Sequence, residues 1–98
     1  MECAKFPRVR DLVIFHDSKG KSHNALVQCV HGDEVQFNNG FVPCINVIYI
    51  SDDESRQDTY GRQFERETSL VHACNQAAHG MYWRWPEEKP NPVVAHQS

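Results

Sequence analysis

The sequence has no apolar run long enough to cross a membrane. A membrane-spanning helix needs roughly 20 apolar residues in a row, and the longest apolar stretches here, such as Leu12–Phe15 and Val47–Ile50, fall far short of that. The stretch from Met1 to Arg10 alternates charged and apolar side chains and lacks the apolar centre of a signal peptide. We therefore expect a soluble protein that stays inside the cell.

An excess of positive charge is also missing. Ten Lys and Arg residues stand against thirteen Asp and Glu residues, which gives a net charge of -3. Such a chain has no diffuse positive field that could hold duplex DNA or an anionic membrane. We expect neither of these as a partner, and a nucleotide would have to be held by a local group of side chains.

The cysteines form no Cys-x-x-Cys pair, the usual mark of a zinc ribbon or a redox site. In an intracellular protein we expect reduced, mostly buried thiols rather than disulfides. Two pairs, Cys29 with His31 and His72 with Cys74, could meet as metal ligands if their strands are neighbours, but neither has zinc-site spacing, so we expect no metal and no other cofactor. The four cysteines are Cys3, Cys29, Cys44 and Cys74.

Known catalytic motifs are absent from the chain. There is no nucleophile elbow, no phosphate-binding glycine loop, no dinucleotide fingerprint and no deaminase signature. Ser69 and His72 are only a short local pair, and the acidic stretch Asp52–Glu54 lacks the ligand spacing of a calcium loop, so it is interpreted as a solvated loop. We predict that the protein binds and is not an enzyme.

The first half of the chain has the pattern of strands and tight turns. Asp11–His16 and Ser22–Val30 flank turn residues and predict a hairpin. Glu34–Phe37 is predicted to be a short strand. Cys44–Ile50 is apolar on nearly both faces and is the best candidate for a central strand.

The second half begins with the most polar stretch, Ser51–Gly61, which is predicted to be an exposed loop. Gln63–Val71 can be a strand or a helical turn followed by a strand, and we predict a strand. His72–Gly80 is interpreted as a connection, and Met81–Trp85 alternates strictly and predicts the last strand. Three prolines and charged residues follow, and residues 89–98 are predicted to be a disordered tail.

Five or six short strands in 98 residues are too few for two large sheets, and closing them into a barrel removes exposed strand edges. We predict an all-β fold: a small five- or six-stranded barrel of the Src-homology-like kind, with at most one short helical turn. Residues 1–88 form this single domain.

Two segments combine arginine with aromatic side chains. In the first, Tyr60-Gly61-Arg62 with Arg66 close behind, a ring and a guanidinium could stack on a base and hold a phosphate. Arg62 has no obvious structural partner in so polar a loop.

The second segment is Tyr82–Trp85, where two indoles and a tyrosine flank an arginine. The indoles either fill the core or stack on a ligand, and alternation places Tyr82 and Arg84 on the opposite face from them. The candidate ligand-binding residues are Tyr60, Arg62, Arg66, Tyr82, Trp83, Arg84 and Trp85.

The chain from Val9 to Glu88 resembles small uncharacterised proteins of tailed bacteriophages and prophages. The resemblance rests on Val9–Val30, on Asn46–Ile50 and on the closing Trp83-Arg84-Trp85-Pro86-Glu87 motif. It implies a phage protein that acts in the cytoplasm of a bacterial host. Small phage proteins of this kind include sponges for nucleotide immune signals, inhibitors of defence proteins and minor virion components.

Together, the residues and the resemblance predict a phage-encoded protein that binds and sequesters a cyclic or linear nucleotide signal and so blocks anti-phage defence. A barrel this small has little concavity, so we expect the pocket to form between protomers of a homo-oligomer. The alternatives are an interaction module that docks on and inhibits a host protein, and a minor virion component.

Overall fold

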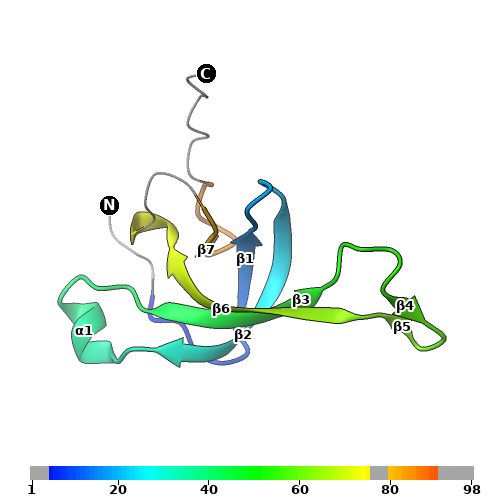
Figure 1. Cartoon of the computed structure of the whole chain (residues 1–98). Coiled ribbons are helices and arrows are strands. Elements are labelled where there is room, and N and C mark those ends of the chain that lie inside the picture. Colours follow the sequence, from blue (N-terminus) through cyan, green and yellow to red (C-terminus); the bar gives the residue numbers. More distant parts are fainter. Residues whose placement is uncertain (1–4, 76–79, 91–98) are drawn as a thin grey trace, which may run out of the picture.

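The computed structural model describes residues 5–75 and 80–90. Five strands close into a barrel in the order β1-β2-β3-β6-β7, and two short strands form a separate hairpin (Figure 1). This confirms the predicted all-β small barrel. The strands are β1 (Leu12–His16), β2 (Ser22–His31), β3 (Cys44–Ile50), β4 (Gln57–Asp58), β5 (Gly61–Arg62), β6 (Phe64–His72) and β7 (Tyr82–Arg84). The helical segments of the described residues are α1 (Glu34–Asn38) and the 3-10 turn η1 (Ala73–Asn75).

The predicted hairpin of β1 and β2 is confirmed, and its alternation builds one side of the core. Val13 lies opposite Ala25 in the antiparallel register, and both side chains are buried. At the turn, the Asp17 carboxylate accepts hydrogen bonds from two backbone amides, those of Lys19 and Lys21. Gly20 adopts a φ of 86°, a conformation that glycine enters without strain.

The predicted strand Glu34–Phe37 is wrong, because this segment is helix α1. Asp33 caps the helix, since its carboxylate accepts a hydrogen bond from the Gln36 amide at 2.9 Å. The Gln36 side chain in turn accepts a bond from the Asp33 amide at 3.3 Å. This reciprocal capping box overrides the weak alternation of a four-residue segment.

The central-strand prediction is confirmed, because β3 lies between β2 and β6. The predicted strand over Gln63–Val71 is confirmed as β6. The barrel closes where β7 runs antiparallel to β1 and parallel to the end of β6. The predicted connection after His72 includes η1, and its residues 76–79 lie outside the described part, as do residues 91–98 of the predicted tail.

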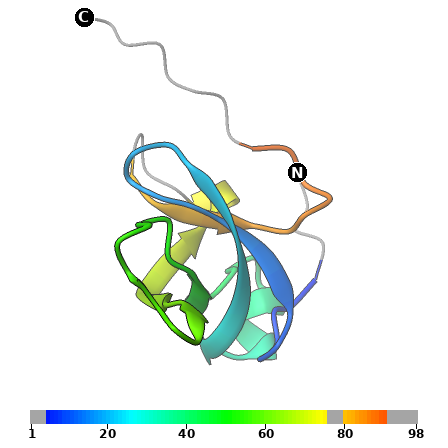
Figure 2. The same cartoon turned by 90° about the vertical axis from the view of Figure 1, so that its right-hand side faces the viewer.

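The polar stretch after β3 is exposed from Asp52 onward, as predicted, but Ser51 at its start is buried, and the stretch leads into the hairpin β4–β5. This hairpin and the outer ends of β3 and β6 form an arm that projects from the barrel (Figure 1). Viewed from the side of the arm, β1 and β2 lie next to each other in the barrel wall (Figure 2). In the described part of the chain, no helix has the length and apolar character needed to span a membrane.

Candidate functional site

Both tryptophans of the closing motif belong to the core. Trp83 and Trp85 are fully buried, and their rings meet edge to face with centroids 5.3 Å apart. Neither indole N–H has a hydrogen-bond partner in the described structure. The core alternative is therefore the correct one, and these two predicted ligand-binding rings are inaccessible to a ligand.

Tyr82 and Arg84 also make contacts within the protein itself, although alternation predicted that they would remain as binding residues. The Tyr82 ring is buried and stacks on His16 at 4.5 Å. The Arg84 guanidinium donates to His16 Nε2 at 2.9 Å and to the Glu88 backbone oxygen at 2.7 Å. Arg84 thus fastens the turn that follows β7, because that turn brings the Glu88 carbonyl back to the guanidinium.

Arg62 does have structural partners, so the expectation that it lacks one is wrong. Its guanidinium donates to the backbone oxygen of buried Ser51 at 2.9 Å and to Gln57 Oε1 at 3.2 Å. The first bond connects β5 to the base of the arm, and the second connects it to β4. Tyr60, at the tip of the same hairpin, is 96% exposed.

The structure does not bring the seven predicted residues together. Tyr60 and Arg62 lie on the arm, whereas β7 lies in the barrel wall (Figure 1). Of the seven, only Tyr60 and Arg66 have side chains that are both exposed and without a hydrogen bond to the described residues. Nucleotide binding at these residues stays a prediction, because the seven side chains do not meet in one site.

The thiols are more accessible than expected. Cys29 and Cys44 are free and half-buried, and Cys74 is exposed, while Cys3 lies outside the described residues. The pairs that could have met as metal ligands are separated, because β3 lies between β2 and β6. Within residues 5–75 and 80–90, no group of three His, Cys, Asp or Glu residues is placed to hold a metal ion.

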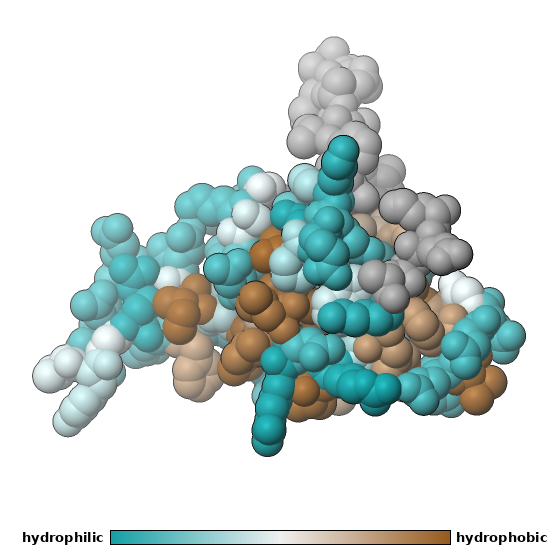
Figure 3. Space-filling view, turned by 180° about the vertical axis from the view of Figure 1, so that it is seen from behind, coloured by the Kyte–Doolittle hydropathy of each residue, from teal (hydrophilic) through white to brown (hydrophobic). Residues whose placement is uncertain are grey.

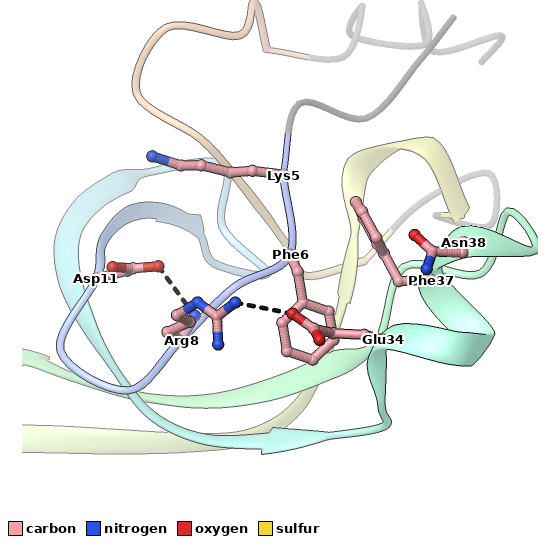
Figure 4. A pocket seen from close by; sticks show the side chains of 7 residues that line it. All are labelled: Lys5, Phe6, Arg8, Asp11, Glu34, Phe37 and Asn38. Atoms are coloured by element: carbon pink, nitrogen blue, oxygen red, sulfur yellow. Dashed lines mark hydrogen bonds and ion pairs between the residues drawn. The ribbon is translucent and has the colours of Figure 1, made fainter.

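One hollow of about 590 Å³ lies beside α1 (Figure 4). Its charges are largely paired internally: Arg8 forms an ion pair with Glu34 at 2.8 Å, and the Arg8 amide donates to Asp11. The Lys5 ammonium lies over the Trp85 ring, 4.6 Å from its centroid. The hollow therefore offers no cluster of unpaired cations to an anionic ligand. Its lining residues are Lys5, Phe6, Arg8, Asp11, Glu34, Phe37 and Asn38.

A second hollow, of about 480 Å³, lies between β6 and the β1–β2 turn and is acidic. Its lining includes five carboxylates and two lysines. Burial and the carboxylates of Glu67 and Glu65 raise the pKa of Tyr49, which lies among them. A negative field of this kind disfavours a phosphate and favours a cation. The charged lining residues are Asp17, Lys19, Lys21, Asp52, Asp53, Glu65 and Glu67; we call this hollow the acidic groove.

The outer wall of the barrel carries a feature that the sequence analysis missed. Apolar side chains lie next to one another across four strands, and hydrophobic atoms gather in the middle of the face seen in Figure 3. Phe64 is 67% and Ile50 is 61% exposed. Leu12, Leu26 and Ile48 follow one another across the strands in register, and Ile50 pairs with Phe64. We call these five side chains the apolar band: Leu12, Leu26, Ile48, Ile50 and Phe64.

A cation, Arg66, lies beside the apolar band. Arg66 lies directly opposite Ile48 and two residues after Phe64, so it shares their face of the sheet. It is exposed and has no ion pair within the described residues. Glu65 and Glu67 point to the other face, so among the residues of β6 Arg66 is the charged side chain on the face of the band.

The band was missed because its strand was interpreted as buried on both faces. Cys44–Ile50 has the continuous apolar run of a central strand. In the structure Ile45 and Val47 are buried, but the Ile50 side chain is exposed on the outer face of β3. Exposed Leu12 and Phe64 lie on other strands, and only the register shows that Leu12 is next to Leu26 and that Phe64 is next to Ile50.

No protein-family model matches the chain, and no curated protein or solved structure matches it either.

Proposed function

We propose that the protein is a non-enzymatic interaction module that docks on another protein through the apolar band. The observation that carries this proposal is the exposure of neighbouring large apolar side chains on one outer face. The largest apolar patch of a typical monomer measures about 300–600 Å² and often marks a binding site. Four members of the band are each about half exposed or more, and four side chains of this size together expose an apolar area within that range. These four are Leu12, Leu26, Ile50 and Phe64.

The partner that fits this face is a protein surface with an apolar centre and a carboxylate placed against Arg66. Each side of a standard interface buries about 800 Å², so the band would supply the apolar core and its polar neighbours the rim. A second copy fits less well, since its own band offers Arg66 no carboxylate. The resemblance to small phage proteins makes a bacterial host protein our proposed partner, and inhibition of that protein the proposed effect.

The test compares two charge insertions in the full chain. Ile50→Asp places a carboxylate in the band, and Val35→Asp places one on α1, where Val35 is comparably exposed. Tagged wild-type and variant proteins capture proteins from bacterial host lysates, and each captured protein is identified, purified and titrated by calorimetry. We expect Ile50→Asp to weaken binding more than about 30-fold, because a hot-spot change costs 2 kcal/mol or more. Val35→Asp is expected to change affinity less than twofold.

Two results would overturn the proposal. If no captured protein depends on the band, docking through it is wrong. If light scattering shows a stable dimer that Ile50→Asp dissociates, the band serves self-association, and the predicted homo-oligomer replaces a separate partner.

A further inference from the structure

The first half of β6 has an open edge. On one side, β3 pairs with β6 from Phe64 to Leu70. On the other side, β7 meets β6 only at Val71 and His72. Between Phe64 and Ser69, no strand among the described residues covers the side of β6 that is turned away from β3. The backbone N–H and C=O groups of such an edge are a template for a further strand.

This open edge borders the acidic groove. Glu65 and Glu67 line the groove from β6, and Met81 and residues of the β1–β2 turn, Asp17 among them, also line it. A strand added to β6 would therefore lie along the groove. The hollow volume of about 480 Å³ leaves room for its side chains.

Only some of the charged side chains in the acidic groove are paired with other residues of the chain. Lys21 pairs with Asp52, and Arg56 pairs with Glu65. The Asp17 carboxylate is bound by His23 at 2.9 Å and by the turn amides. Glu67 is half-buried and forms no ion pair within residues 5–75 and 80–90. The groove thus keeps a carboxylate for a cation that the chain itself does not provide.

Alternation along β6 gives the edge a charge pattern. Glu65 and Glu67 face the groove, whereas Phe64 and Arg66 face outward. We propose that an extended segment of another protein adds to this edge as an antiparallel strand. Its basic residues, two positions apart, lie opposite Glu65 and Glu67, and an acidic residue between them lies opposite Arg66. This site goes beyond the docking of the apolar band, because it uses the strand edge and the groove.

A second copy of the chain fits this edge less well, because the same charges disfavour the registers that are centred on them. Antiparallel self-pairing centred on Arg66 places arginine opposite arginine and Glu65 opposite Glu67. Centring the pair on Glu65 or on Glu67 places that glutamate opposite its own copy. Like charges directly opposite each other destabilise a strand pair, so each of these registers is disfavoured.

The test uses the labelled peptide Thr-Val-Lys-Asp-Lys-Val-Thr, in which the two lysines match Glu65 and Glu67. Two control peptides accompany it: one with Asp-Lys-Asp at the centre, and one that is N-methylated at alternate residues and cannot complete a strand ladder. Binding to the full chain is measured by fluorescence anisotropy, and amide shifts along β6 are followed by NMR. We expect the Lys-Asp-Lys peptide to bind at least tenfold more tightly than either control.

The matched protein variants are Glu67→Lys and Glu87→Lys, which change the net charge equally. Glu87 is exposed and lies after β7, so its variant is expected to retain affinity, whereas Glu67→Lys is expected to lose at least tenfold. Equal binding of the N-methylated peptide, or equal loss in both variants, would reduce the site to non-specific charge attraction and overturn the proposal. No binding at all would overturn it as well. Leu12→Asp changes the apolar band on β1, a strand that does not pair with β6, and should leave peptide binding unchanged, so this site and the apolar band can fail separately.

Discussion

Replacing Trp83 with alanine tests whether the closing motif is core rather than ligand surface. The indole is fully buried and packs edge to face on Trp85 and on His72, with centroids 5.3 Å and 4.6 Å away. Truncating a buried tryptophan to alanine costs about 3–5 kcal/mol, through lost transfer energy and the cavity left behind. Small domains are stable by about 5–15 kcal/mol. Trp83→Ala should therefore remove a large part of the free energy of unfolding.

Urea denaturation followed by far-ultraviolet circular dichroism measures this loss. With a slope of about 2 kcal/mol per molar urea, a loss of 4 kcal/mol lowers the midpoint by about 2 M. Trp83→Phe keeps a ring and removes the indole N–H that has no partner, so it should cost less than half as much. Tyr60→Ala is the exposed control and should change stability by less than about 0.5 kcal/mol. A midpoint for Trp83→Ala equal to that of the control would refute the core assignment.

Two further predictions concern polar contacts. Arg62→Ala should cost about 1–2 kcal/mol in the same urea assay, because the guanidinium donates to Ser51; a loss below the error of the assay would mean that these bonds do not stabilise the arm. Burial and the adjacent Arg84 lower the pKa of His16, so its neutral form stabilises the fold fully above the unfolded value of about 6.5 and this contribution is lost as the pH falls below it. His16→Gln should therefore show a shallower loss of stability between about pH 7 and pH 5 than the wild type, and parallel pH profiles would contradict this role.

The sequence was sufficient for the strands whose patterns were long or strictly alternating. Ser22–Val30 and Cys44–Ile50 were predicted within one residue of β2 and β3, because hydrophobic period and flanking turns act locally. Glu34–Phe37 was too short for a period to be decisive. Its capping signal, Asp33 followed three residues later by Gln36, was present in the sequence and would have predicted the helix.

The candidate sites were harder to predict than the strands. Arg62 was chosen as a binding residue because it has no obvious structural partner in its polar loop, and Arg84 because two indoles and a tyrosine flank it. Each is bound instead to a backbone carbonyl that the fold brings to it: Ser51 for Arg62, and Glu88 for Arg84. An arginine's partner is set by three-dimensional position, and residue type alone could not separate a fold contact from a ligand contact.

The sequence by itself determined that this chain would fold as a small barrel of short strands, because alternation and turn residues are properties of neighbouring positions. Only the tertiary structure decided which surfaces remain for partners. Strand register places Leu26, Ile48 and Phe64 on one outer face, and the brief contact of β7 with β6 leaves the edge from Phe64 to Ser69 open. Both features depend on pairings between segments distant in sequence, which no local pattern specifies.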